Sequence, residues 1–237
     1  MAACRHPWPI NQPYREHIVP KVSEMHIEPV SLALVREFCA QFHYTGLPGN
    51  AAWRWGLYSG SNLYGVIAYN NGTRGLGASI LGDEHARKVW HIGRIVMSED
   101  APTNSESRII GLSLREIHRT RPDVWAVVTF ADEEMGHIGT IYQATNAIYT
   151  GTTDSTSGTA RLYFKNKAGQ IRSWRSIREA GRSGVDGWEL QKATKPKHRY
   201  VYVLGTSRQR RQRLALLKFP AIAYPERVAH MNDQEDT

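Results

Sequence analysis

The chain has 237 residues, of which 41% are hydrophobic and 22% are charged, a balance that is ordinary for a globular protein and excludes a disordered one. No run of about 18 apolar residues is present, which excludes a membrane-spanning helix. The first residues, MAACRHPWPINQP, lack the apolar core of a signal peptide. The two cysteines, Cys4 and Cys39, give no disulfide framework, so we predict a cytoplasmic protein.

The net charge of +8 is distributed very unevenly along the chain. Between Arg161 and Lys218 the sequence has 16 basic and 3 acidic residues, which leaves 14 basic and 19 acidic residues elsewhere. One segment therefore carries the basic character. Such asymmetry predicts a polyanionic partner, most simply nucleic acid, and a merely solubilising surface is the alternative.

The chain begins with an arm and a strand-helix unit. Residues 1–21 contain four prolines and little periodicity, which favours an extended arm over the body. Residues 21–30 are typical of a strand. A helix is then predicted from Ser31 as N-cap, with an apolar stripe that ends at Phe42 before a loop rich in glycine and proline.

Three further strands are predicted before the middle of the chain. The segments 51–58 and 62–70 are joined by Ser-Gly-Ser, which indicates a hairpin. Residues 72–88 are expected to form a glycine-rich loop, without the spacing of a phosphate-binding fingerprint. The alternation in 89–97, VWHIGRIVM, predicts another strand.

A helix is predicted after Pro102, with Thr103 and Glu106 as a capping box. Its free backbone N–H groups could hold an anion, and Ser105 and Ser107 would add hydroxyl groups.

The segment 124–151 combines a buried strand with a polar end. Residues 124–130 are apolar and β-branched, and a helix is expected over 139–147. Asp132, His137, Tyr142 and Tyr149 are therefore expected to gather where the strand ends, which is where open α/β sheets bind ligands.

The basic segment is expected to continue the fold with a hairpin that turns near Gly169 and with a last strand in KHRYVYVLG. Together these elements predict one α/β domain over 22–224 with a mixed sheet, an insert at about 160–218 and a disordered tail at 225–237. The element order is also that of the GNAT acyltransferase fold.

Four blocks give the sequence a family likeness: FHYTG at 42–46, GRIVMSEDAPTNSESR at 93–108, TFADEEMGHIGTIYQATNAIYTG at 129–151 and KHRYVYVLG at 197–205. Together they resemble the phage Mom DNA-modification family. The resemblance implies a GNAT-like enzyme that converts adenine in double-stranded DNA to N6-carbamoylmethyladenine, in the host cytoplasm, and so protects phage DNA from restriction. It covers about residues 28–224.

The resemblance also indicates which residues act. It implies a catalytic set of His43, Tyr44, Arg94, Asp132 and Tyr142. For the cofactor it implies Ser107, with Gly139 and Tyr149 as further candidates beside His137, and the helix start adds Ser105. Structural alternatives remain, because Arg94 could simply pair with Asp132 or Glu106, and His43 with Tyr44 could cap a helix.

The chemistry assigns roles to these residues. A flipped adenine needs stacking partners, for which Tyr44, Trp53, Trp55, Tyr142 and Tyr149 are candidates. Asp132 or His43 would accept the proton of the attacking amine, and Arg94 would stabilise a developing oxyanion. We expect Asp132, Tyr142 and Tyr149 to form one wall of the pocket, and His43 with Tyr44 to form the other.

The donor is not fixed by the sequence. The usual coenzyme A loop, Gln/Arg-x-x-Gly-x-Gly/Ala, is absent from APTNSESRIIG. The added CH2-CO-NH2 group is an isomer of glycyl, which favours glycyl-tRNA over acetyl-CoA. An iron site of His43, His91 or His137 with Asp132 is a further alternative.

The basic segment is interpreted as a DNA clamp that contacts phosphates. Its candidate residues are Arg172, Arg175, Arg178, Arg208, Arg210, Arg211 and Arg213. Two other functions stay open: a GNAT-fold acyl- or aminoacyltransferase that acts on tRNA or a protein amine, and a non-catalytic DNA-binding module.

Overall fold

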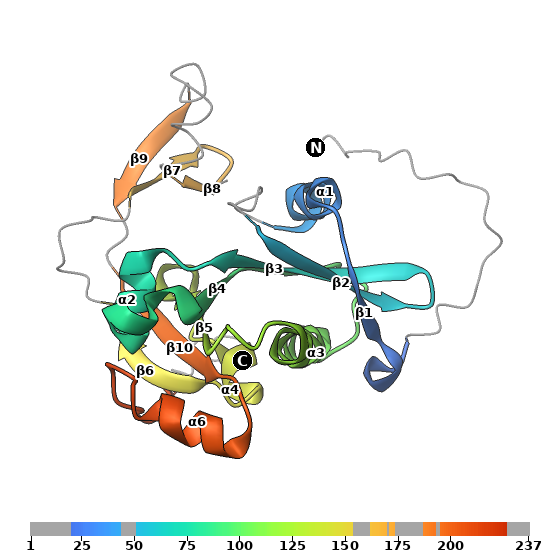
Figure 1. The fold of residues 1–237 in the computed structure, drawn as a ribbon. Helices are drawn as coiled ribbons and strands as arrows, with labels where there is room; N and C mark the ends of the chain where they lie inside the picture. The colour runs from blue at the N-terminus through green and yellow to red at the C-terminus, as the bar shows by residue number, and fades with distance from the viewer. Residues whose placement is uncertain are drawn as a thin grey trace, which may run out of the picture.

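The computed structural model describes residues 20–43, 51–153, 162–169, 171–173, 187–192 and 195–226. These residues form a seven-stranded sheet covered by helices and a separate three-stranded sheet (Figure 1). The larger sheet has the order β1-β2-β3-β4-β5-β10-β6. Its strands are β1 (His26–Pro29), β2 (Trp53–Ser59), β3 (Asn62–Asn71), β4 (Val89–Met97), β5 (Ala126–Asp132), β6 (Ile148–Thr152) and β10 (Lys197–Val203).

The helices lie on both faces of this sheet. They are α1 (Leu32–Phe42), α2 (Arg74–Leu81), α3 (Ser105–Thr120), α4 (Thr140–Ala144) and α6 (Ser207–Leu214), with short 3-10 turns η1 (Val22–Glu24), η2 (Asp83–Lys88) and η3 (Glu133–Met135). All strand pairs are antiparallel except β4 with β5. The predicted α/β fold with a mixed sheet flanked by helices is confirmed.

Local chemistry explains the elements that the sequence predicts well. The Ser31 hydroxyl accepts a hydrogen bond from the Leu34 N–H at 3.1 Å, so α1 begins at the expected cap. The hairpin of β2 and β3 turns at Gly60, whose φ of 55° suits glycine. The strands expected at 89–97 and at the end of the basic segment are confirmed as β4 and β10.

The glycine-rich loop predicted at 72–88 is wrong. Residues 74–81 form α2, whose N-cap Thr73 accepts from the Leu76 N–H at 3.2 Å. Gly77 is a packing glycine here, because a Cβ atom at this position would collide with the backbone of Ala86 in η2. Close contact between α2 and η2, and not a loop, therefore requires the glycine.

Two helix boundaries also differ from the prediction. Asn104 is the N-cap of α3 in the left-handed conformation and makes no side-chain cap bond, so the capping box of Thr103 and Glu106 is wrong. The segment expected to be helical over 139–147 is helical only in α4. Asn146, with φ of 58°, lies between α4 and β6, and Tyr149 consequently belongs to a strand.

The two faces of the central sheet have separate cores. On the side that we call the α1 face, α1 packs on Val66, Ala68 and Val96, and α2 packs on the neighbouring strands. On the opposite side, the α3 face, Ile109, Ile110 and Ile117 of α3 pack on the other side chains of the same strands. Figure 1 shows α1 and α3 on opposite sides of β2 and β3.

The three-stranded sheet has the order β8-β7-β9, from β7 (Leu162–Asn166), β8 (Ile171–Ser173) and β9 (Trp188–Lys192). The β7–β8 hairpin turns at Gly169, as predicted. The insert predicted at 160–218 is not one unit, because β10 lies between β5 and β6 in the central sheet. Residues 1–19 and 227–237 lie outside the described residues, so the arm and most of the tail stay predictions.

Within the described residues, no helix has the length and apolar character needed to cross a membrane.

Candidate functional site

The central sheet opens between β4 and β5. These parallel strands pair only from Val89 with Ala126 to His91 with Val128. Beyond that point β4 continues along β3 as far as Met97, and β5 continues along β10 as far as Asp132. The carboxyl ends of two parallel strands with different outer neighbours are where α/β sheets bind ligands.

A β-bulge in β4 sets the direction of its polar side chains. In the pairing with β3, Ile92 opposes Tyr69 and Arg94 opposes Ala68, so Gly93 is the extra residue. Without it, His91 and Arg94 would lie on opposite faces, because side chains alternate along a strand. The bulge places both on the α1 face, in line with the role of bulges in re-aiming side chains.

A basic cluster forms around Arg94 on the α1 face. His43 follows the last residue of α1 and lies close enough to Arg94 and His137 to interact electrostatically with both. Burial, then Arg94 and then His137 lower the pKa of His43 to about 4. The helix end, the bulged strand and the loop after β5 thus bring three predicted residues together.

His91 belongs to the same surroundings. Its ring lies 5.6 Å from the ring of Phe130 on β5. Burial, then the charge of Lys197 and then that of Arg94 together lower the pKa of His91 to about 4. At neutral pH both His43 and His91 are therefore uncharged, and Arg94 is the cation of the cluster.

Asp132 is held in place at the end of β5. Its Oδ2 atom lies 2.5 Å from Lys197 Nζ, in the residue pair that opens the β5–β10 ladder. Its Oδ1 atom accepts a hydrogen bond from the Glu134 N–H at 3.2 Å. Only 22% of the Asp132 side chain is exposed, so the carboxylate has a fixed position on the α1 face.

The two histidines give the protein a defined pH dependence of stability. An unfolded histidine binds a proton near pH 6.5, whereas folded His43 and His91 do so only near pH 4. Between these values the unfolded state binds more protons, so the free energy of unfolding falls as the pH falls from 6.5 to 4. We expect the urea midpoint to show this decline and His91→Gln to make it shallower. An identical decline in that variant would contradict the assignment.

Tyr142 and Tyr149 lie on the other side of the sheet. Both pack around Tyr200 of β10, at ring distances of 5.4 and 5.1 Å, in the α3-face core. Asp132 shares its face with Phe130 and Lys197. The predicted single wall of Asp132, Tyr142 and Tyr149 is therefore wrong, because the alternation of β5 and β10 separates them.

The α3 face has its own polar contacts beneath the end of β5. The Tyr149 hydroxyl lies 2.9 Å from His198 Nδ1, and His198 Nε2 lies 3.6 Å from Glu133 Oε2. Gly139, with φ of 85°, lets the backbone approach the ring of Tyr200. Sequence reasoning missed both this arrangement and Lys197, because the partners come from β10, far along the chain.

The serines at the start of α3 differ in their surroundings. Ser105 is fully buried, and its hydroxyl donates to the Pro102 carbonyl at 2.6 Å. It stabilises the turn before α3 and does not face a ligand, so the prediction of Ser105 as a cofactor-binding residue is wrong. Ser107 is half-buried, in the first turn of α3.

The metal alternative lacks a suitable cluster. His43 and His137 lie near each other, but in the described part of the chain no three His, Cys, Asp or Glu side chains gather as a metal site. The predicted iron ligands do not fit a two-histidine, one-carboxylate site in this arrangement.

The predicted DNA clamp is divided by the fold. Arg208, Arg210 and Arg211 are exposed on α6. Arg213 is only 9% exposed, and its Nη1 atom donates to the Leu204 carbonyl at 2.7 Å. Arg213 therefore anchors α6 and is not available for phosphate, which corrects that prediction. Tyr44, Arg175 and Arg178 lie outside the described residues, as does the side chain of Arg172.

Comparison with known proteins gives a family match over most of the chain. The model of the Mom protein family matches residues 24–226. The methylcarbamoylase Mom of Escherichia phage Mu is 28% identical over 211 residues, which cover 86% of this chain and 84% of that protein.

Solved structures with a similar course of the chain include two acetyltransferases. The ribosomal-protein-S18-alanine N-acetyltransferase of Escherichia coli has a TM-score of 0.46 at 7% identity, over 77% of this chain and 96% of that one. The spermidine N-acetyltransferase of Vibrio cholerae has a TM-score of 0.46 at 8% identity, over 76% and 96%.

Proposed function

Because the chain belongs to the Mom protein family, we propose that it is a phage DNA-modifying transferase that converts adenine in double-stranded DNA to N6-carbamoylmethyladenine and so protects the DNA from restriction. The similarity to the phage Mu methylcarbamoylase supports this function. So does the arrangement of the polar residues of the α1 face.

The observation that carries the proposal is the placement of Arg94, His43 and Asp132 on one face beside the opening between β4 and β5. An adenine amine is a poor nucleophile, so it needs a proton acceptor and a cation for the charge that develops on the acyl oxygen. Asp132, fixed by Lys197, is the acceptor that we propose. Arg94, flanked by two neutral histidines, is the cation.

The target base must leave the duplex to reach this face. Flipped bases are commonly stacked on aromatic side chains. Trp53, Trp55, Tyr142 and Tyr149 belong to the α3-face core and do not serve there. Phe130 is half-buried, lies on the α1 face two residues before Asp132 and contacts His91. We assign the stacking role to Phe130.

The donor that balances the reaction most simply is a glycyl ester, as in glycyl-tRNA. The N6 amine attacks the glycyl carbonyl, the ester C–O bond breaks, and the departing hydroxyl takes the proton. The glycyl amine then attacks C6, and the bond from C6 to the original N6 breaks. The original nitrogen becomes the terminal amide, and no oxidant or reductant is needed. Acetyl-CoA, in contrast, would require a separate nitrogen source.

Nucleoside mass spectrometry tests both the function and the donor. Duplex DNA incubated with the protein and glycyl-tRNA made from [15N]glycine is expected to contain carbamoylmethyl-deoxyadenosine. The label should stay on the base when the terminal carboxamide is lost by fragmentation. Label lost with the carboxamide would contradict the rearrangement, and product formed only with acetyl-CoA would contradict the glycyl donor. DNA that remains unmodified with either donor and in co-expressing cells would contradict the function itself.

A further inference from the structure

A second basic surface lies at the end of the sheet that is remote from Asp132. It is formed by η2, by α6 and by the segment after α6, and we call it the α6 surface. Its exposed cations are Arg87, Arg208, Arg210, Arg211 and Lys218, and Lys88 lies half-buried at its base.

Trp125 joins the two halves of this surface. The backbone N–H of Trp125 donates to the Lys88 carbonyl at 2.8 Å, and the backbone carbonyl of Trp125 accepts from the Leu204 N–H at 2.9 Å. Lys88 Nζ lies 3.4 Å from the centre of the indole ring, and the guanidinium carbon of Arg213 lies 4.8 Å from it. Lys88 and Arg213 therefore hold α6 against η2 through Trp125. The other arginines of α6 are exposed to solvent.

The charges of α6 are not balanced within the protein. The helix SRQRRQRL has no acidic residue, and among the described residues no ion pair involves Arg208, Arg210 or Arg211. On η2, the other half of this surface, the acidic residues are Asp83 and Glu84. Asp83 already lies 3.9 Å from Arg74. Like charges three or four residues apart destabilise a helix, and a polyanion would relieve this repulsion.

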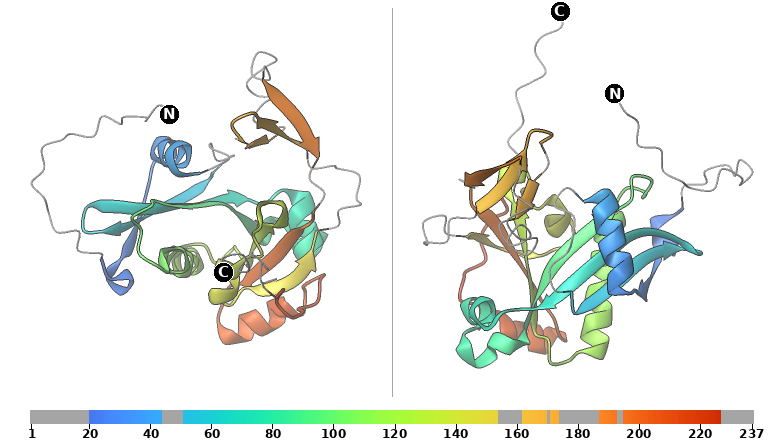
Figure 2. Two further views of the ribbon diagram at one scale, coloured as in Figure 1. Left: turned by 180° about the vertical axis from the view of Figure 1, so that it is seen from behind. Right: turned by 90° about the horizontal axis from the view of Figure 1, so that it is seen from above.

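The α6 surface and the adenine site are at opposite ends of β10. Lys197, at the start of β10, pairs with Asp132, whereas Val203, at its end, pairs with Ala126 just before α6. Seven strand residues at about 3.3 Å each separate the two ends by about 20 Å. Figure 1 and both views of Figure 2 place α6 far from the small sheet of β7, β8 and β9.

We propose that the α6 surface binds the phosphodiester backbone of nucleic acid at a distance from the modified adenine. This inference rests on the proposed function in DNA modification. The occupant that we assign to it is the part of the substrate duplex that flanks the target adenine, because the family match supports DNA as the substrate. At 3.4 Å per base pair, about 20 Å corresponds to about six base pairs.

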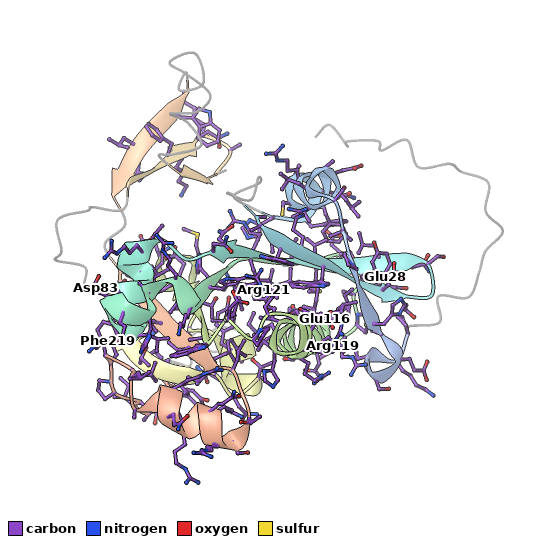
Figure 3. All side chains as sticks on the ribbon, in the orientation of Figure 1. Glu28, Asp83, Glu116, Arg119, Arg121 and Phe219 are labelled. Atoms are coloured by element: carbon purple, nitrogen blue, oxygen red, sulfur yellow. The ribbon has the colours of Figure 1, made fainter. Side chains whose placement is uncertain are left out.

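The test compares a triple variant, Arg208→Ala, Arg210→Ala and Arg211→Ala, with a charge-matched control. Alanine preserves the helix, and Arg213 stays in place. The control replaces Lys21, Arg74 and Arg119 with alanine, which removes the same charge from cations that already have acidic partners. Figure 3 shows Arg119 with Glu116 on α3 and Asp83 near α2. Binding is measured against salt for a 9-base-pair duplex, a 31-base-pair duplex and bulk tRNA.

If the substrate supplies the phosphates, the triple variant binds the 31-base-pair duplex at least 10-fold more weakly. The slope of log K against log salt concentration becomes shallower by about two to three. Binding of the 9-base-pair duplex changes less than twofold. Weaker binding of tRNA alone would assign the α6 surface to RNA and overturn the proposal. The control variant should retain its binding of all three ligands. Unchanged binding of both long ligands would overturn the proposal, as would an equal loss in the control. Since binding is read without turnover, failure of the modification reaction gives a separate result.

Discussion

Replacing Asp132 with alanine is expected to reduce adenine modification at least 100-fold, because a positioned general base typically contributes 10²- to 10⁴-fold. The carboxylate is fixed by Lys197 at 2.5 Å and by the Glu134 N–H at 3.2 Å. The measurement is the fraction of modified deoxyadenosine after a single-turnover reaction.

The variants around Asp132 separate proton transfer from positioning. Asp132→Asn keeps the shape of the side chain, and it should be as inactive as the alanine variant if the carboxylate accepts the proton. Lys197→Met leaves the carboxylate but removes its partner, and we expect an intermediate loss. Activity of the asparagine variant within tenfold of the wild type would show that Asp132 is not the base. The urea midpoint of each variant controls for folding.

The sequence predicts the parts of this fold that depend on local pattern. Ser31 caps α1, the alternation of 89–97 marks β4, and the aromatic and β-branched run of 197–203 marks β10. The failures have long-range causes. The glycines of α2 look like loop residues, yet Gly77 is required by contact with Ala86 from the next turn. No local pattern reports such contacts.

The candidate site shows the same limit more sharply. The motifs identify Arg94, His43 and Asp132, but the direction of Arg94 depends on the single extra residue Gly93, which is visible only in the pairing with β3. The sequence predicts Tyr149 just after a helix and beside Asp132. It lies instead on β6, where pairing with Tyr200 puts it on the α3 face. Spacing along the chain cannot distinguish the two faces of a sheet whose register is set by distant strands.

Replacing Arg94 is expected to reduce adenine modification strongly. Its positive charge and its guanidinium fork can be tested separately, because they affect different measurements. Arg94→Gln removes both the charge and the guanidinium fork, and we expect modification to fall by about 10²- to 10³-fold, as for the loss of a donor to an oxyanion. After burial, the charge of Arg94 also helps to lower the pKa of His43 and of His91. Burial raises the pKa of the Cys39 thiol to about 11, and the charge of Arg94 offsets part of that rise. The pKa of His43 should therefore rise above about 4 in this variant, which NMR titration of the imidazole would detect.

Arg94→Lys separates the charge from the fork. Lysine keeps a positive charge near His43, so the pKa of His43 should stay low, but a point charge does not reproduce the paired donors of arginine. We expect this variant to lose most of its activity while its histidine titration resembles that of the wild type. Arg119→Gln on α3, where Arg119 pairs with Glu116 at 2.7 Å, should change neither. If Arg94→Lys is fully active, the site needs only a cation, and bidentate recognition of the acyl oxygen or of a phosphate is no part of the mechanism.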